Sequence, residues 1–572
     1  MDRKLSLTSI LGNKLINLFS ISLLFILMGC STSKPYTLGP IKTFDPDTSR
    51  IPEPQENESF QYWDRIDNTI FHQISKPLDL NNTVRVTGRI LGISTKKQAD
   101  NINHLDEVPE SSWYNYRHFY SPMLIEEIAR GPNTVSPDTS GLWTIFSAKL
   151  EGANPGFFIE DVNGNRFLIK FDGTNYPELA TSADVIGSKI FHAAGYNVPE
   201  ATITYFHPEK VIIADGVMVE ENGEKRPMTQ QDYNKIIKNR TTGNKGNIRA
   251  LASKFVDGTP VGQWEFKGTR KDDPNDRVAH EHRREIRGMR VISSWLNDTD
   301  RRDANTMAVY TDEGYIKHLV QDFGNTLGAN GGGIHEPIYG QAYLIDPRFM
   351  ALNAVSLGLY VNYWETIDAQ NYIPHPSVGY FRSETLNPGN WVSVHPLPAY
   401  ENMTLRDAFW GAKQVMSFSD KEIAAIVKTG KLTSPLAEEY LTKVLIERRD
   451  KIGKHWFSRI NPIDKFRAAV KNDSLVLSFS DLGIDGKFFN ATDTKYEYSV
   501  WIEDGKHLID NQNVLDPEIK ISLSDNYFRE KSPIVIGYKV ITRRAEESIS
   551  EKATLVYVFL EKNGPRVVGI ER

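Results

Sequence analysis

Short runs rich in apolar residues, separated by loops with Gly, Asn and Pro, follow one another over residues 143–171. Runs of this length bounded by turn residues predict three strands. Asn163 and Gly164 tolerate positive φ and predict a tight hairpin turn inside the stretch. The predicted strands are 143–150, 157–161 and 166–171.

Two later stretches repeat apolar residues every three or four positions, which is typical of helices packed on a core. The first is 179–194, which Gly195 ends, and the second is 280–296. A polar turn follows the second stretch, and then a predicted hairpin with strands at 306–310 and 315–320.

Helical spacing returns over residues 405–465, and after about residue 466 the pattern changes to a period of two. Several short strands separated by turns predict a C-terminal all-β sandwich. These strands are 474–480, 495–503, 519–523, 534–541, 554–560 and 565–570.

Three further stretches carry weaker patterns. Residues 83–93 predict a single strand, and residues 220–276 are polar and glycine-rich, which favours a solvated insertion over a binding patch. Residues 356–400 are rich in Tyr, Trp and Pro. They favour irregular packed loops between helices, with an aromatic platform for sugars as the alternative.

The first 29 residues predict a processing segment rather than part of the fold. Basic residues precede an apolar run over 15–28, which is too short to span ~30 Å of hydrocarbon as a helix. The run ends in Leu27-Met28-Gly29-Cys30, which resembles a lipobox, where the cysteine thiol receives a diacylglycerol. A transmembrane anchor with an incidental cysteine is the alternative, but Cys30 is the only cysteine in the chain.

The lipobox resemblance implies a location as well as an anchor. A residue other than Asp after the lipidated cysteine usually permits sorting to the outer membrane, and here that residue is Ser31. We therefore expect a lipid-anchored envelope protein at the outer membrane, facing the periplasm or the cell surface. The Pro-rich polar stretch 30–55 is typical of a solvated tether.

The composition is that of a soluble globular chain with several domains. Charged residues make up 24% of the 572 residues, and the formal net charge is −6. A negative chain is a poor non-specific ligand for nucleic acid, so we expect no nucleic-acid partner. The length exceeds what one small core would hold, and two or three domains are expected.

The chemistry-bearing residues follow one another in a recognisable order. A hairpin with a glycine-bearing loop, containing Gly152 and Gly156, precedes Lys170 on a strand. A helix with an acid comes next, then a second helix and the spacing Asp300-x4-Asn305. A further hairpin ends in Asp322-Phe-Gly.

This order resembles that of atypical kinase-like families, namely HipA-like kinases, phosphatidylinositol kinases and CotH-type spore-coat kinases. The resemblance covers residues 143–465 and implies an α+β fold with a two-lobed, protein-kinase-like domain. It implies a phosphotransferase that uses Mg²⁺ and ATP or another nucleotide. This sequence also departs from the kinase pattern, since the loop is not Gly-x-Gly-x-x-Gly and no Ala-Pro-Glu follows Asp322-Phe-Gly.

The resemblance implies a role for each residue. Lys170 would neutralise phosphate charge, and an acid of the next helix, either Glu178 or Asp184, would orient it; Gly152 and Gly156 would let backbone approach phosphate. Asp300 would accept the proton of the acceptor hydroxyl. Asn305 and Asp322 would supply oxygen ligands to Mg²⁺.

Other catalytic motifs are not supported by the sequence. His280 and His282 lie two positions apart, and side chains two apart on a regular helix point about 200° from each other, so they would not chelate one ion. The zinc-hydrolase, serine-hydrolase and Walker motifs are missing from the sequence. His318 on a predicted strand is more typical of a structural histidine than of a ligand.

The predicted organisation is a signal peptide (1–29), a tether (30–55), an N-terminal extension (56–142), a kinase-like domain (143–465, with an insertion at about 220–276) and a sandwich (466–572). Two functions remain open. The first is a phosphotransferase that acts on an envelope protein or glycan. The second is a non-catalytic binding or structural lipoprotein, which the scarcity of ATP outside the cytoplasm favours.

Overall fold

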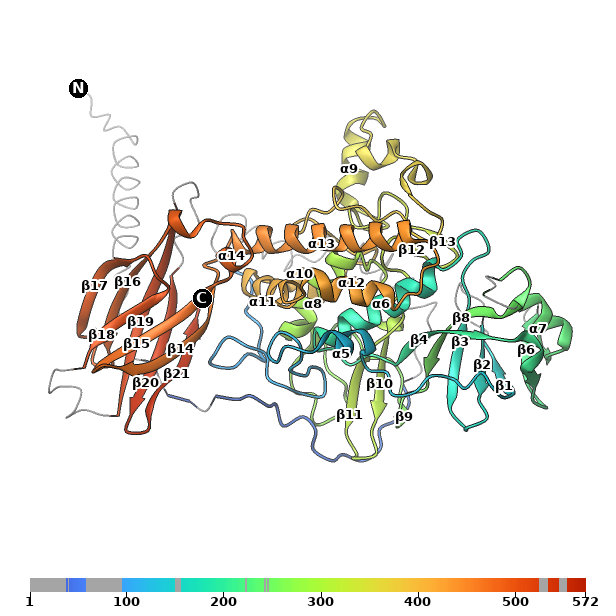
Figure 1. The fold of residues 1–572 in the computed structure, drawn as a ribbon, viewed down its shortest axis with the longest axis horizontal. Coiled ribbons are helices and arrows are strands. Elements are labelled where there is room, and N and C mark those ends of the chain that lie inside the picture. Colours follow the sequence, from blue (N-terminus) through green and yellow to red (C-terminus); the bar gives the residue numbers. More distant parts are fainter. Residues whose placement is uncertain are drawn as a thin grey trace, which may run out of the picture.

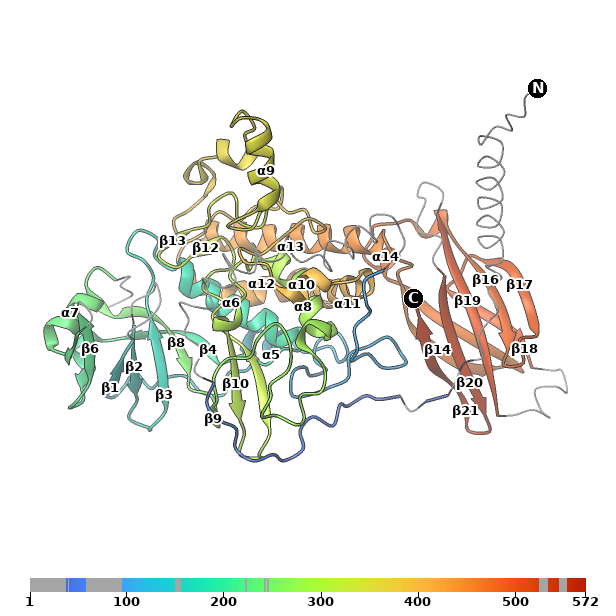
Figure 2. The same ribbon diagram turned by 180° about the vertical axis from the view of Figure 1, so that it is seen from behind.

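The computed structural model describes residues 36, 38–39, 41–57, 95–149, 156–221, 224–240, 243, 246–523, 533–544 and 553–572. These residues form an elongated molecule (Figure 1). A six-stranded sheet lies at one end, helices fill the middle and two further sheets lie at the other end, as the reverse view also shows (Figure 2). The chain is a mixed α/β protein with several sheets.

The six-stranded sheet has the order β4-β8-β3-β2-β1-β5. Neighbouring strands are antiparallel except β1 and β5, which are parallel. Apolar side chains on one face form a buried cluster that includes Phe157, Ile169 and Phe206. The strands are β1 (Trp143–Ala148), β2 (Gly156–Glu160), β3 (Arg166–Lys170), β4 (Ala201–Phe206), β5 (Val211–Ile213) and β8 (Ile248–Lys254).

Part of the stretch expected to be a solvated insertion is instead an interior strand. β8 lies between β4 and β3, and its residues from Ile248 to Ala252 are buried. The sequence disguises this strand because Arg249 stands in it. The buried Arg249 guanidinium donates to Asp172 Oδ2 at 3.1 Å and to Gly430 O at 2.7 Å, so its charge is paired inside the protein.

Helix α6 (Leu179–Ala193) follows the sheet's central hairpin and is buried almost throughout. Near the sheet's edge lie a small hairpin and a short helix, with residues of both packed against the apolar cluster of the sheet. These elements are η2 (Pro208–Lys210), β6 (Met218–Glu221), β7 (Glu224–Pro227) and α7 (Gln230–Ile237).

The middle of the molecule is helical and contains a large buried cluster with Trp295, Phe409 and Leu445. Within it α8 crosses α11 closely, at Gly288 and Gly411. The elements are α5 (Ile125–Arg130), η4 (His280–His282), α8 (Arg284–Leu296), η5 (Asp303–Asn305), α9 (Pro347–Val355), η6 (Tyr363–Thr366), η7 (Ala369–Tyr372), α10 (Pro398–Asn402), α11 (Leu405–Met416), α12 (Asp420–Lys428) and α13 (Pro435–Phe457).

Two small sheets accompany these helices. The first has the order β11-β10-β9, and the second pairs β12 with β13. In the first, Thr306 pairs with Val320, so Asn305 and Gln321 face each other just beyond the end of the hairpin. The strands are β9 (Thr259–Pro260), β10 (Thr306–Tyr310), β11 (Ile316–Val320), β12 (Ala329–Asn330) and β13 (Gly333–Ile334).

The C-terminal region consists of a three-stranded sheet, β14-β15-β18, and a five-stranded sheet, β17-β16-β19-β20-β21. Residues of both belong to one buried apolar cluster, although the sandwich itself stays a prediction. The elements are β14 (Ile463–Lys471), β15 (Ser474–Asp481), α14 (Leu482–Asp485), η8 (Ala491–Asp493), β16 (Thr494–Ile502), β17 (His507–Val514), β18 (Glu518–Ser522), β19 (Ile534–Arg544), β20 (Thr554–Glu561) and β21 (Gly564–Glu571).

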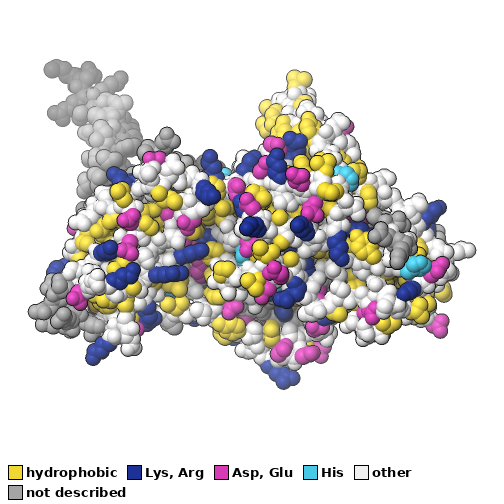
Figure 3. All heavy atoms as spheres, viewed as in Figure 1, with side chains coloured by type: hydrophobic (Ala, Val, Ile, Leu, Met, Phe, Trp, Pro, Cys, Tyr) yellow, Lys and Arg dark blue, Asp and Glu magenta, His cyan; other side chains and the backbone are white. Residues whose placement is uncertain are grey.

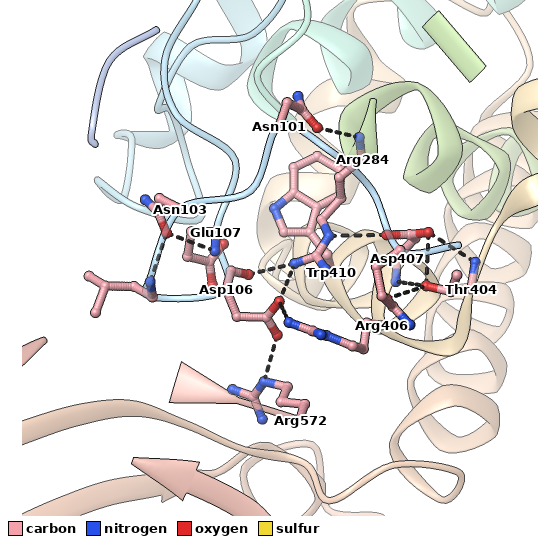
Figure 4. A network of polar contacts seen from close by, with 12 residues as sticks. Asn101, Asn103, Asp106, Glu107, Arg284, Thr404, Arg406, Asp407, Trp410 and Arg572 are labelled. Carbon is pink, nitrogen blue, oxygen red and sulfur yellow. Dashed lines mark hydrogen bonds and ion pairs between the residues drawn. The ribbon is translucent and has the colours of Figure 1, made fainter. Parts of the chain in front are cut away.

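A buried network of charges joins the C-terminal sheets to the helices (Figure 4). Asp106 Oδ1 lies 2.6 Å from Arg284 Nη1 and 2.6 Å from Arg406 Nη2, and Asp106 Oδ2 lies 3.2 Å from Arg572 Nε. Arg572 also lies 3.1 Å from Asp464 Oδ1. One carboxylate therefore holds two helices and the last residue of the chain together.

Some predicted features lie outside the described residues: the segment 1–29 with Cys30, the strand at 83–93 and Gly152. Residues 356–400 contain η6 and η7 between irregular segments, but their first part is exposed rather than packed. No helix in the described ranges is both long enough and apolar enough to cross a bilayer.

Candidate functional site

The centre of the candidate site is an ion triad at the end of β3. Lys170 Nζ lies 3.4 Å from Asp184 Oδ2 and 3.4 Å from Asp322 Oδ1. Asp184 projects from α6, and Asp322 follows β11. The structure thus brings together a lysine and two carboxylates that are far apart in sequence.

The three charges support one another. Burial alone would lower the pKa of Lys170, but the Asp322 and Asp184 carboxylates outweigh it and raise that pKa. Lys170 in turn lowers the pKa of Asp322. Burial raises the pKa of Asp184, and the Lys170 ammonium opposes this shift. The lysine is therefore held as a cation next to an ionised Asp322.

Asp322 is held in an unusual backbone conformation, with φ of 57°. Phe323 after it is buried, and its ring lies 4.8 Å from that of Phe191 on α6. Gly187 of α6 makes room for this packing, because a Cβ at Gly187 would lie 2.7 Å from Phe323 Cβ. The buried phenylalanine fixes the direction in which the Asp322 carboxylate points.

Asp300 and Asn305 lie together on the turn before β10. Asn305 Nδ2 donates to Asp300 O at 2.7 Å and to Asp300 Oδ2 at 3.2 Å. Asn325 Nδ2 also donates to Asp300 Oδ2, at 2.8 Å, and Arg302 Nε lies 3.3 Å from Asp300 Oδ1. The Asp300 carboxylate is thus oriented by two amides and one guanidinium.

Arg301 connects these two parts of the site, although no role for it was predicted from the sequence. Its guanidinium donates to the carbonyl oxygens of Gln321, at 2.8 Å, and of Asp322. Arg301 Nε lies 2.8 Å from the buried carboxylate of Asp298. An arginine directly after the candidate acid Asp300 on a polar turn was the available signal, because its charge needs buried acceptors once the turn is covered.

Asn305 and Asp322 fit the requirements of a hard cation. The Asp322 side chain is 46% exposed, whereas those of Lys170 and Asp184 are 13% and 9% exposed. Asn305 uses Nδ2 as its donor, so Oδ1 is the atom that would coordinate. Mg²⁺ needs only one or two such protein oxygens when phosphates and waters supply the rest. Within the described ranges no three His, Cys, Asp or Glu side chains form a metal group.

Two other predicted residues, Glu178 and Gly156, have structural contacts of their own. Glu178 lies at the N-terminus of α6 with φ of 68°, and its Oε2 accepts from the Thr433 N–H at 3.0 Å. Of the two acids that the sequence left open, Glu178 and Asp184, the one that contacts Lys170 is therefore Asp184. Gly156 pairs with Lys170 across β2 and β3, and a Cβ there would lie 2.1 Å from Ile169 O, so close strand packing already requires this glycine.

The histidines have structural partners, as the sequence predicted for His318. His318 Nδ1 lies 3.0 Å from Ser112 Oγ, and its ring stacks on Trp113. His280 begins the short helix η4 rather than the longer predicted helix, and its Nε2 lies 2.7 Å from Asp276 Oδ2. These rings are already bonded within the protein.

No family model and no curated protein matches the chain. Among solved structures, the chain is weakly similar to a crystal structure of the golgi casein kinase, with 10% identity and a TM-score of 0.25 over 73% of this chain and 94% of that chain. A crystal structure of the Golgi casein kinase with Mn/ADP bound gives 13% identity and a TM-score of 0.20, over 67% of this chain and 97% of that chain. The structural neighbours are kinases, and the chain's own activity has to be argued from the site.

Proposed function

We propose that the chain is a kinase-like phosphotransferase that depends on Mg²⁺ and a nucleotide, carried by a two-lobed α+β domain. The observation that carries the proposal is the position of Lys170 Nζ, 3.4 Å from both Asp184 and Asp322. A lysine oriented by a helix acid, beside a second acid with an exposed edge, is what a phosphate and its metal require.

The remaining residues divide the work of the transfer between them. Asn305 and Asp322 would hold Mg²⁺, which screens phosphate charge, and Lys170 would neutralise further phosphate oxygens. Asp300 would accept the proton of the acceptor hydroxyl as its oxygen bonds to the γ-phosphorus. The bond from that phosphorus to the β-phosphate oxygen breaks, and the diphosphate keeps its electron pair.

The proposed location of the chain at the cell envelope also limits which acceptor the phosphotransferase would use. The predicted lipid anchor on Cys30 would hold the chain at the outer membrane, on the periplasmic side or the cell surface. The acceptor would then be a hydroxyl of an envelope protein or glycan.

A non-catalytic lipoprotein is the second candidate, and one observation favours it. Asp322, the expected metal ligand, is in ion-pair contact with Lys170, so the triad also makes sense as a structural ion pair. In that case, the site would stabilise the fold without binding a nucleotide.

A thermal-shift titration separates the two candidates. The full chain, with Cys30→Ser to prevent acylation, is heated with Mg²⁺ and a series of nucleotides, beside the same chain with Asp322→Ala. A ligand that binds only the folded state raises Tm by mass action. At a hundredfold excess over Kd, it adds about 2.7 kcal/mol to the free energy of unfolding. We expect a rise that requires both Mg²⁺ and Asp322.

Asp312→Ala is the matched control, because Asp312 lies in an exposed turn beyond β10. It should keep the full shift. A chain that melts at the same temperature with and without every nucleotide would contradict the phosphotransferase and support the structural candidate.

A further inference from the structure

A projection formed by α9 and the residues after it stands out from the helical part of the molecule (Figure 1). Its tip is apolar: Val355 is 85% exposed, Leu357 90% and Leu359 85%. None of the residues of α9 is buried. The space-filling view shows hydrophobic side chains gathered on this projection (Figure 3). Apolar exposure on this scale marks an interaction surface.

The tip is free of charge. No Asp, Glu, Lys, Arg or His occurs in residues 349–364. Aromatic side chains lie at its base, where the rings of Phe349 and Trp364 are 5.0 Å apart and bring the two ends of the segment together. Arg348 at the base is paired with Asp346 at 2.6 Å, so its charge is balanced within the protein.

The backbone at the tip satisfies its own donors. The N–H groups of Ser356, Leu357, Gly358 and Leu359 donate to carbonyl oxygens of residues 352–356. The N–H of Tyr360 donates to Ser356 Oγ at 3.0 Å. A chain segment that enters hydrocarbon has to satisfy its backbone in this way, because no water is available there.

We propose that this tip inserts into the outer part of one leaflet of a lipid membrane. A protein partner would cover one face of a projection, whereas these side chains are exposed around α9 and along the loop after it. A lipid phase accepts apolar groups from every side without requiring a complementary shape. The aromatic base suits the headgroup boundary, where Trp and Tyr are enriched.

The depth of insertion follows from the length of the segment. Sixteen uncharged residues folded back on themselves are too few to cross ~30 Å of hydrocarbon, so the tip would remain at the interface. The lipid anchor predicted at Cys30 supports this location, because it would hold the chain at a membrane and make weak insertion effective.

A fluorophore at the tip tests the inference. Cys30 is the only cysteine, so a chain with Cys30→Ser and Val355→Cys carries one thiol, which takes an environment-sensitive dye. The matched control carries Leu515→Cys, since Leu515 is 74% exposed in the C-terminal region. Vesicles of phosphatidylcholine should shift the emission at position 355 to the blue, and nitroxide lipids should quench it, with no change at position 515.

Leu357→Ser with Leu359→Ser should raise the vesicle concentration for a half-maximal shift, roughly tenfold or more per leucine. These side chains are outside the core, so the fold should be unchanged. Because insertion is apolar, adding phosphatidylglycerol or 0.5 M salt should change the result by less than about twofold.

Three outcomes would overturn the inference. The emission at position 355 stays unchanged while the chain is bound to vesicles by other segments. The blue shift occurs without vesicles and grows with protein concentration, which means that a second copy covers the tip. The shift requires anionic lipid and disappears in salt, which means that charge drives the binding.

Discussion

At the scale of single residues, the choice of the lysine's partner decides how the candidate site is built. Lys170 lies between Asp184 and Asp322, while Glu178 is turned toward the backbone of Thr433. In the sequence, Glu178 and Asp184 are six residues apart and are equally good candidates for the lysine's partner. They differ in space because Glu178 stands in the turn before α6 and Asp184 faces inward from its second turn.

Replacing each acid by its amide tests this assignment. Asp184→Asn removes a charge that holds Lys170 in place, and we expect the apparent Kd for Mg²⁺-nucleotide to rise about tenfold or more, in line with charge-assisted bonds worth 1.5–3 kcal/mol. Glu178→Gln can still accept from Thr433 and should leave Kd within about twofold. Isothermal titration of the two variants measures both.

If Glu178→Gln weakened the binding of Mg²⁺-nucleotide and Asp184→Asn left it unchanged, the role of Asp184 would be contradicted. Equal and complete loss in both variants would have to be checked against Tm, because a buried helix terminus that unfolds would weaken binding indirectly.

At the scale of elements, the crossing of α8 and α11 determines how close the middle helices approach. A Cβ on Gly411 would lie 2.7 Å from Gly288 O, and one on Gly288 would lie 2.5 Å from Trp410 Cε3. Two glycines in facing helices therefore let the backbones come together. Asp298 and Arg301, which support the site, follow α8 directly, so this crossing also sets their position.

Gly411→Ala should destabilise the chain although alanine favours a helix. Propensity alone would stabilise the helix by about 1 kcal/mol. Forcing a methyl group against a facing carbonyl costs about 1–3 kcal/mol and should dominate. Urea unfolding followed by circular dichroism measures the sign. Gly332→Ala is the control, because a Cβ there would meet nothing within 4 Å and should change stability by less than about 0.5 kcal/mol.

At the scale of the whole molecule, Asp106 holds the C-terminal sheets to the helices. Burial alone would raise its pKa, but Arg284, Arg406 and Arg572 lower it to about 2. A carboxyl with a depressed pKa stabilises the fold above its ordinary pKa of about 4, and this contribution disappears as pH falls toward 2. Acid should therefore loosen this junction (Figure 4).

Asp106→Asn should lower the free energy of unfolding at pH 7 by about 3–5 kcal/mol, because it removes a buried carboxylate shared by three guanidinium groups, although Arg284 and Arg572 keep Asp407 and Asp464. The difference from the parent chain should shrink as pH falls from 4 to 2. Urea titrations at both pH values measure it, with Asp312→Asn in an exposed turn as the control. A constant difference over this range would contradict the role of the ionised carboxylate.

Elements whose signals are local could be predicted from the amino-acid sequence alone. Strands β2 and β3 and helix α6 match the predicted ranges within about a residue, because period and turn chemistry act between near neighbours. The order of Lys170, Asp300, Asn305 and Asp322 could also be read from the sequence, through its resemblance to kinase-like families. The hairpin β10–β11 also follows from local pairing, and it returns the chain from Asn305 to Asp322.

The remaining features could not be predicted, because they depend on contacts between residues that are distant in the sequence. β8 can lie inside the sheet because the Arg249 guanidinium forms an ion pair with Asp172, 77 residues away along the chain. Asp184 rather than Glu178 contacts Lys170, because the Glu178 carboxylate accepts from the backbone of Thr433, 255 residues away along the chain. The apolar residues of 356–400 were expected to be packed; later ones such as Phe381 and Trp391 are buried, whereas Leu357 and Leu359 near the start are exposed. A hydrophobic pattern shows which side chains favour burial. Whether they are buried depends on which other elements pack against them in the fold.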